Sequence, residues 1–214
     1  MGRGMRTRIK ICGIREPEHA RLAGELGVDA IGLVFYARSP RGVGPGEAAA
    51  VVAACPPFVT TVGLFLDPEP GLVEHVLEQV PLDLLQFHGD ERPEDCRRYG
   101  RPYIKAIPMG EGIDARRYAQ TYPDARGFLI DSHAAGAAGG TGRVFDWSRW
   151  PRGLDRPLIL AGGLTPQNVG EAIRRAAPYG VDVSSGVESA RGVKDPRRMA
   201  AFCREVRRAD AEQQ

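Results

Sequence analysis

The sequence predicts an α/β fold, a single (β/α)8 TIM barrel, and three observations lead to it. Short apolar segments alternate with helical patterns from one end of the chain to the other. Most of these segments are continuously apolar rather than alternating, which is typical of parallel strands covered on both faces. The length of 214 residues, 43% of them hydrophobic and 26% charged, suits one such barrel and leaves little room for a second domain.

Eight strands are predicted in chain order. They are Arg8–Cys12, Asp29–Phe35, Phe58–Phe65, Asp83–His88, Tyr103–Ile107, Gly127–Asp131, Pro157–Ala161 and Val181–Ser184. Eight strand–helix units in one domain imply a closed barrel. The alternative is an open doubly wound sheet, which needs fewer strands and a phosphate-binding turn after the first one. Neither G-x-G-x-x-G nor G-x-x-x-x-G-K-[ST] follows the first strand, which argues against the open sheet.

Helical patterns lie between the strands. The predicted helices are Pro17–Leu26, Glu69–Gln79, Pro93–Tyr99, Pro166–Arg175 and Asp195–Arg207. Gly27 follows the first of them, where a C-terminal cap is expected. Thr165 and Asp195 each precede a proline, the pattern of a capping residue with proline at the first helical position. We expect one domain over 1–214, with frayed ends at 1–5 and 210–214, and a mobile active-site loop at 134–142.

The composition narrows the kinds of binding partner and the cellular compartment that we expect. The net charge is +2 with acids and bases interspersed, so no basic stripe indicates a nucleic-acid partner. No apolar run is long enough to indicate a membrane span. The four cysteines (Cys12, Cys55, Cys96 and Cys203) lie far apart and form no C-x-x-C pair, which favours free thiols in the cytoplasm. The four histidines have no metal-ligand spacing, so we expect no metal site.

A phosphate site is predicted at the loops after the seventh and eighth strands. The seventh strand leads into Gly162 and Gly163, and the eighth into Ser185 and Gly186. Glycine lets main-chain N–H groups approach phosphate oxygens without interference from a Cβ atom. In TIM barrels these two loops, with a short extra helix, commonly hold phosphate, and a helix beginning at Gly186 would add its dipole. Either turn alone would be an ordinary tight turn; two at the expected strands favour phosphate.

An acid and a base are predicted at the same rim. Cys12 closes the first strand and Asp131 the sixth, so a parallel barrel brings both side chains to one mouth. A thiolate is a base and a carboxylic acid a proton donor, which indicates an isomerase acting on a phosphorylated sugar. The structural alternatives are a small buried hydrophobe for Cys12 and a turn-capping carboxylate for Asp131.

Three more residues are candidates for substrate binding. Arg41, after the second strand, either pairs with a substrate carboxylate or is an ordinary surface arginine. His88 ends the fourth strand and either polarises the substrate or satisfies its neighbours. Asp182, in the eighth strand, either binds a substrate hydroxyl or anchors the barrel.

These segments together resemble the phosphoribosylanthranilate isomerases, the tryptophan-pathway members of the ribulose-phosphate-binding barrels. The similar segments, in order over most of the chain, are Lys10 to Gly13, Phe35 to Arg41, Val62 to Phe65, Leu85 to Glu91, Ile104 to Ile107, Leu129 to Ser132, Gly139 to Gly142, Phe145 to Trp147, Ala161 to Leu164, Val181 to Glu188 and Gly192 to Asp195. Each is weak alone, but their joint order is specific.

The resemblance implies an Amadori rearrangement of N-(5-phosphoribosyl)anthranilate to 1-(2-carboxyphenylamino)-1-deoxyribulose 5-phosphate, without a cofactor. It implies Asp131 as acid, Cys12 as base and Arg41 at the anthranilate carboxylate, in a monomer or homodimer. One alternative is an isomerase of the analogous histidine-pathway aminoaldose, or an enzyme for both substrates; these usually pair two aspartates, unlike this chain. Another is a non-catalytic phosphosugar-binding barrel, which would tolerate loss of Cys12 or Asp131.

Overall fold

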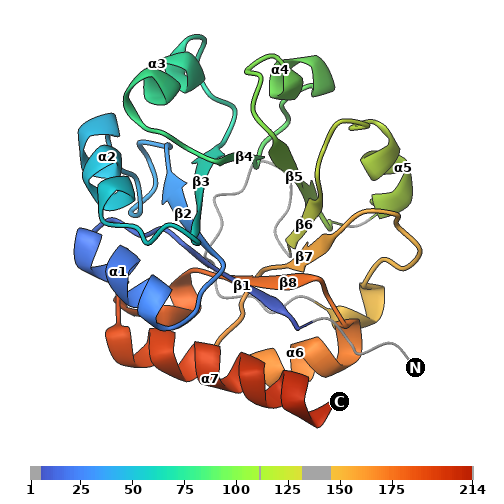
Figure 1. The fold of residues 1–214 in the computed structure, drawn as a ribbon. Helices are drawn as coiled ribbons and strands as arrows, with labels where there is room; N and C mark the ends of the chain where they lie inside the picture. The colour runs from blue at the N-terminus through green and yellow to red at the C-terminus, as the bar shows by residue number, and fades with distance from the viewer. Residues whose placement is uncertain (1–5, 111, 132–145, 214) are drawn as a thin grey trace.

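The computed structural model describes residues 6–110, 112–131 and 146–213, and its centre is a closed barrel of eight parallel strands (Figure 1). Each strand pairs with the next, and β1 closes the ring against β8. The strands are β1 (Arg8–Cys12), β2 (Ala30–Val34), β3 (Thr60–Phe65), β4 (Leu84–Phe87), β5 (Tyr103–Pro108), β6 (Phe128–Asp131), β7 (Leu158–Leu160) and β8 (Gly180–Val183). The predicted barrel is confirmed, and the strands differ from their predicted ranges by no more than two residues at either end.

Helices surround the barrel and cover its outer face (Figure 1). The α-helices of the described ranges are α1 (Pro17–Glu25), α2 (Pro45–Ala53), α3 (Leu72–Gln79), α4 (Pro93–Arg97), α5 (Ala115–Gln120), α6 (Val169–Ala176) and α7 (Pro196–Glu212). A 3-10 helix, η1 (Trp147–Arg149), precedes β7. Among these helices none is long and apolar enough to cross a bilayer.

Alternation along each strand separates the core from the barrel interior. On β1, Ile9 and Ile11 belong to the apolar core that contains residues of the surrounding helices. Lys10 and Cys12 therefore face the interior of the barrel, and Lys10 reaches Asp182 on the neighbouring strand β8. The interior of the barrel thus holds polar side chains of β1 and β8, and Cys12 lies at the carboxyl-terminal end of its strand.

Helix ends follow the local sequence signals at two places. Gly27 ends α1 with a φ of +66°, which favours glycine over residues with a side chain. Asp195 caps α7, and its carboxylate accepts hydrogen bonds from the main-chain N–H groups of Arg197 and Arg198. Both predicted caps are confirmed.

The predicted start of a helix at Pro166 is wrong. Asn168 Oδ1 accepts a hydrogen bond from Thr165 N at 2.7 Å, and its amide donates to Gly163 O at 2.9 Å. The asparagine side chain holds residues 165–168 in a turn, so α6 begins only at Val169. Helices α2 and α5 were not predicted, because α2 is rich in alanine and so shows little contrast between its faces, and α5 is too short to show a period.

Three further expectations concern loops and ends. The predicted helix from Gly186 is a single 3-10 turn, η2 (Ser185–Val187), because the chain continues into a hairpin of β9 (Glu188–Ala190) and β10 (Val193–Lys194). The tail does not fray after Ala209: α7 continues to Glu212, and Asp210 accepts hydrogen bonds from the main-chain N–H and hydroxyl of Thr7. The predicted mobile loop at 134–142 lies outside the described residues.

Candidate active site

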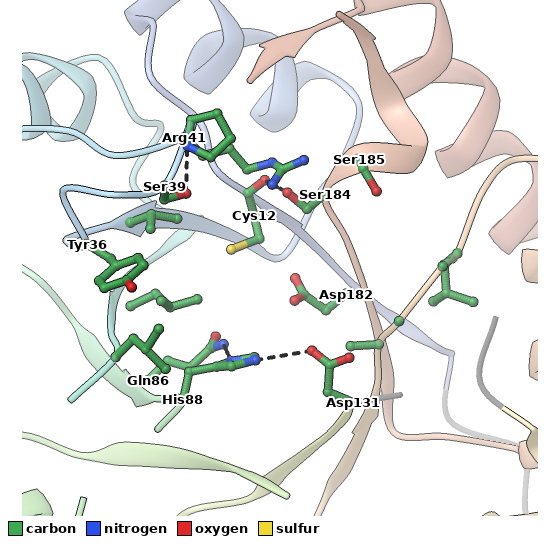
Figure 2. Close-up of a pocket in the computed structure, with 18 of the residues that line it drawn as sticks. Cys12, Tyr36, Ser39, Arg41, Gln86, His88, Asp131, Asp182, Ser184 and Ser185 are labelled. Carbon is green, nitrogen blue, oxygen red and sulfur yellow. Dashed lines mark hydrogen bonds and ion pairs between the residues drawn. The ribbon is translucent and has the colours of Figure 1, made fainter. Parts of the chain in front are cut away.

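One pocket opens at the carboxyl-terminal rim of the barrel, and most of the residues predicted to function meet there (Figure 2). Figure 2 shows the side chains of Cys12, Asp131 and Asp182 turned toward the same space. The polar residues that line the pocket are Tyr36, Arg38, Ser39, Arg41, Gln86, His88, Asp131, Asp182, Ser184, Ser185 and Arg191, together with Cys12. A thiol and a carboxyl group that come from β1 and β6 therefore face one cavity.

Cys12 is 5% exposed and stands at the end of β1, next to Gly32 of β2. A Cβ atom on Gly32 would lie 2.8 Å from the Cys12 sulfur, so glycine there leaves room for the thiol. Burial raises the pKa of Cys12, while the ammonium groups of Lys10 and Lys194 oppose that rise. The thiolate, the form that removes protons, thus depends on these two lysines.

Lys10 and Asp182 form a buried ion pair below the sulfur. Lys10 Nζ lies 2.9 Å from Asp182 Oδ1, and the two side chains are 7% and 9% exposed. Burial opposes the charge on Lys10, but Asp182 and Cys12 outweigh it and raise the pKa of Lys10. Asp182 therefore anchors Lys10 and also lines the pocket.

Asp131 is held from the side by His88. His88 Nε2 lies 3.1 Å from Asp131 Oδ2, and His88 Nδ1 lies 3.0 Å from Gln86 Nε2. An amide nitrogen only donates, so Nδ1 accepts and the ring proton is on Nε2, which donates to the carboxylate. His88 thus contacts the predicted acid directly, as Figure 2 shows.

The loops after β7 and β8 form another part of the pocket wall. Gly162 and Gly163 have φ values of +85° and +65°, which favour glycine, and both line the pocket with Ser185. Gly186 does not line it: any side chain there would collide with the main-chain oxygen of Leu164. Gly186 therefore lets the two loops pack together, while Gly162 and Gly163 line the pocket itself.

Arg41 lines the pocket, but it is buried and paired. It is 6% exposed, and its Nε and Nη2 atoms donate to the two carboxylate oxygens of Glu188 at 2.7 and 2.9 Å. Glu188 also accepts from Lys194 Nζ at 2.8 Å and from Gly192 N at 3.1 Å. The guanidinium is thus neither an ordinary surface group nor wholly available to a ligand.

Several residues of the site were not singled out from the sequence. Gln86 is fully buried, and a signal for it exists: Gln86 and His88 are two apart on one strand, so they share a face. Glu188 and Lys194 lie within recognised segments, but their partnership with Arg41 depends on the β9–β10 hairpin. Among the described residues, no three histidine, cysteine or carboxylate side chains are grouped as metal ligands would be.

Comparison with known proteins places these features in a family. The model of the family "N-(5'phosphoribosyl)anthranilate (PRA) isomerase" matches residues 9–205. An N-(5'-phosphoribosyl)anthranilate isomerase of Halorhodospira halophila is 57% identical over 206 residues, covering 96% of this chain and 99% of the relative. The enzyme of that name from Nitrosococcus oceani is 54% identical over 202 residues, covering 94% and 98%.

Solved structures show the same likeness. A phosphoribosyl anthranilate isomerase from Thermotoga maritima has a TM-score of 0.84 and 38% identity, with 94% of this chain and 98% of that chain covered. Another structure, with a TM-score of 0.81, 38% identity and the same coverage, holds reduced 1-(o-carboxyphenylamino)-1-deoxyribulose 5-phosphate. The similarity therefore extends over nearly the whole of this chain.

Proposed function

Because this chain belongs to the N-(5'-phosphoribosyl)anthranilate isomerase family, we propose that the pocket of Figure 2 performs the family's reaction with Cys12 as base and Asp131 as acid. The chain is an isomerase of tryptophan biosynthesis. It converts N-(5'-phosphoribosyl)anthranilate into 1-(2-carboxyphenylamino)-1-deoxyribulose 5-phosphate, an aldose–ketose rearrangement of the Amadori type.

The first step is ring opening. Asp131 donates a proton to the furanose ring oxygen, the C1–O bond breaks, and the nitrogen lone pair forms a C1–N iminium. His88 hydrogen-bonds Asp131 Oδ2 and fixes the carboxyl group against the pocket. The iminium then serves as the electron acceptor for the second step, so the substrate itself supplies the chemistry that a cofactor would otherwise provide.

The second step is proton removal from C2. The Cys12 thiolate takes the proton, and the C2–H electrons form the enolamine, which tautomerises to the ketone of the product. Lys10 and Lys194 favour the thiolate against the effect of burial. General acid and base catalysis each contribute about 10²–10⁴-fold, and the fixed position of the substrate contributes more.

Residues suited to bind the two charged groups of the substrate line the same pocket as the acid and the base. Gly162, Gly163 and Ser185 line the pocket on the β7–β8 side, where we assign the phosphate. Arg41, which Glu188 joins to the hairpin after β8, also lines the pocket, and we assign it to the carboxylate of the anthranilate ring. A phosphoribosyl substrate held by its phosphate and its carboxylate in this pocket would have its sugar within the cavity that Cys12 and Asp131 line.

The observation that supports this assignment most is that Cys12 and Asp131, 119 positions apart in the sequence, line one pocket. The test is a fluorescence assay on freshly made phosphoribosylanthranilate. We expect Cys12→Ala and Asp131→Asn to lower kcat by orders of magnitude while ligand binding survives. Turnover close to the unaltered enzyme in either variant would remove that residue from the mechanism.

The histidine-pathway aminoaldose is the comparison substrate in the same assay. We expect no turnover with it; appreciable turnover would indicate an enzyme for both substrates. We further propose a cytoplasmic location, which cell fractionation tests, and a monomer or homodimer in solution, which light scattering distinguishes. A relative from Thermotoga maritima is described as dimeric, which makes the second measurement informative.

A further inference from the structure

Arg41 has one half of its guanidinium engaged and the other half open. The Nε and Nη2 atoms both donate to Glu188, and the main-chain N–H donates to Ser39 Oγ. No described residue accepts a hydrogen bond from Nη1, although Arg41 lines the pocket. The Nη1 side of the guanidinium is therefore the side left for a ligand, because Glu188 occupies the other side.

We propose that Glu188 is a positioning residue that makes the site selective for substrates with an aryl carboxylate, because it fixes the orientation in which Arg41 presents Nη1 to the ligand. The inference rests on the proposed function, in which Arg41 binds that carboxylate. Glu188 itself lies beyond Arg41 as seen from the pocket lining and acts only through it.

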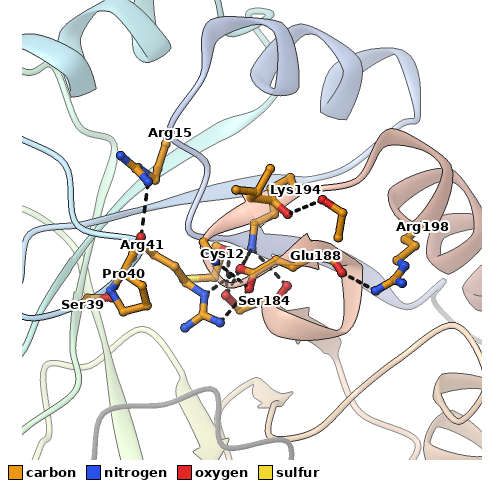
Figure 3. Close-up of polar contacts among 12 residues, drawn as sticks. Cys12, Arg15, Ser39, Pro40, Arg41, Ser184, Glu188, Lys194 and Arg198 are labelled. Atoms are coloured by element: carbon orange, nitrogen blue, oxygen red, sulfur yellow. Dashed lines mark hydrogen bonds and ion pairs between the residues drawn. The ribbon is translucent and has the colours of Figure 1, made fainter.

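Glu188 is built into the structure from several sides (Figure 3). Lys194 Nζ donates to Oε1 at 2.8 Å and Gly192 N donates to Oε2 at 3.1 Å. Lys194 also donates to the main-chain oxygen of Ser184 at 3.0 Å, and Arg198 donates to the main-chain oxygen of Glu188. The β9–β10 hairpin, the loop after β8 and helix α7 thus hold the carboxylate in a single place.

The path of Arg41 to Glu188 is also fixed by glycines. A Cβ atom on Gly13, whose φ is +79°, would lie 2.7 Å from Arg41 Cδ, so glycine leaves the space that the arginine side chain fills. A side chain on Gly192 would collide with the main-chain oxygen of Pro40. The loop that carries Arg41 therefore packs closely against β1 and the hairpin, and the salt bridge determines only the final orientation of the guanidinium.

This arrangement lowers the entropic cost of binding a carboxylate. An unpaired arginine samples many rotamers and loses them when it binds, whereas Arg41 is already held in a fork geometry. Arg41, Glu188 and Lys194 form a buried triad, so solvent cannot replace the carboxylate of Glu188 as the partner of Arg41. A ligand without a carboxylate gains nothing from this preparation, so the effect of Glu188 is confined to carboxylated ligands.

The experiment compares two ligands in binding measurements by calorimetry. One is reduced 1-(2-carboxyphenylamino)-1-deoxyribulose 5-phosphate, and the other is the same compound made with aniline in place of anthranilate. The Kd of the aniline compound divided by the Kd of the carboxylated compound measures the preference for the carboxylate. We expect Glu188→Gln to lower this ratio about tenfold, the equivalent of one charge-assisted hydrogen bond, and to raise KM more than it lowers kcat.

Glu188→Gln leaves Arg41 and Lys194 as unpaired buried cations, which threatens folding. The double variant Glu188→Gln with Lys194→Gln restores the net charge of the triad and still releases Arg41, so the same loss of preference is expected in it. Glu91→Gln is the matched control. Glu91 is also buried and paired with a lysine, Lys105, at 3.2 Å, but it does not contact Arg41. It should leave the ratio unchanged.

Arg41→Met separates this inference from the function on which it rests. If Arg41→Met lowers the ratio and both Glu188 variants leave it unchanged or raise it, the role of Glu188 is wrong and the carboxylate site at Arg41 stands. If Arg41→Met leaves the ratio unchanged, the carboxylate binds elsewhere, and both the assignment of Arg41 and the role of Glu188 fail. A fall in Glu91→Gln as large as that in Glu188→Gln would also overturn the proposal.

Discussion

The charge state of Cys12, the proposed base, depends on its neighbours. Burial raises the pKa of the thiol, while Lys10 and Lys194 oppose that rise. Lys10 in turn keeps its own charge because Asp182 is paired with it at 2.9 Å. The reactivity of one sulfur atom thus depends on a buried pair on β1 and β8 that contributes no proton to the reaction.

The dependence on Lys10 leads to a prediction about pH. The thiolate fraction grows as pH rises toward the pKa of Cys12, so kcat should increase with pH along the ascending limb of the profile. Replacing Lys10 with methionine removes the charge that opposes the rise, so the limb should move to higher pH and kcat at neutral pH should fall about tenfold or more. The measurements are a pH–rate profile and the pH dependence of Cys12 alkylation. If the limb does not move, groups other than Lys10 stabilise the thiolate of Cys12.

The side-chain amide of Gln86 sets the direction of the hydrogen bond between His88 and Asp131. With Gln86 Nε2 against His88 Nδ1, the imidazole donates from Nε2 to an ionised Asp131. Gln86 Oε1 is buried and has no hydrogen-bond partner within the described residues. Rotation of the amide by half a turn would place Oε1 against Nδ1–H, and Nε2 would then accept a hydrogen bond from the protonated form of Asp131.

Removal of this support should affect turnover more than binding. We expect His88→Asn to lower kcat about 10–100-fold with KM nearly unchanged, because the acid loses its orientation and not its contact with the substrate. Gln86→Leu should have a smaller effect in the same direction. Steady-state kinetics on phosphoribosylanthranilate decide the matter. A change confined to KM would mean that His88 binds the substrate and does not position the acid.

At the scale of elements, the β9–β10 hairpin is attached to the barrel by charge. Burial opposes ionisation of Glu188, but Arg41, Lys194 and the N–H of Gly192 lower the pKa of this carboxyl from 4.5 to about 2. A depressed pKa in the folded state stabilises the fold above the unfolded-state value, and this stabilisation is lost as pH falls through the folded-state value. The groups that face Glu188 are the cations Arg41 and Lys194, so its protonation would leave both of them unpaired.

Acid unfolding tests the attachment of the hairpin. Between pH 4.5 and about 2, the Tm of the unaltered protein should decrease more steeply than the Tm of the variant with both Glu188→Gln and Lys194→Gln. Above pH 5 the difference in Tm between the two proteins should be constant. Calorimetric scans across this range measure both. If the two plots of Tm against pH run parallel through the acid range, the pKa of Glu188 is not lowered in the folded protein.

At the scale of the whole molecule, the features predicted from sequence are those that depend on strand order alone. Once eight parallel strands close in sequence order, residues at their carboxyl ends must share a rim, which is why Cys12 and Asp131 were brought together in advance. The pair of Arg41 and Glu188 spans 147 positions and depends on a hairpin with an irregular register. Such a contact has no local pattern, so only the fold reveals it.

The C-terminal helix α7 contacts the residue that precedes β1, the strand that closes the barrel. Thr7, next to β1, is 5% exposed, and its N–H and hydroxyl donate to Asp210 Oδ2 and Oδ1 at 2.9 and 2.6 Å. Because β1 pairs with both β2 and β8, a loss at this contact should weaken the closure and not only the end of α7.

We therefore expect Asp210→Ala to lower the free energy of unfolding by about 1–3 kcal/mol, the cost of leaving buried donors without a partner. Unfolding in urea, followed by circular dichroism and by fluorescence of Trp147 and Trp150, should give one coincident transition with an unchanged m-value. Arg208→Ala is the control, since Arg208 pairs with Glu205 and Glu212 of its own helix at the surface. An early, separate transition in Asp210→Ala would mean that the helix end is released alone and that β1 stays closed without it.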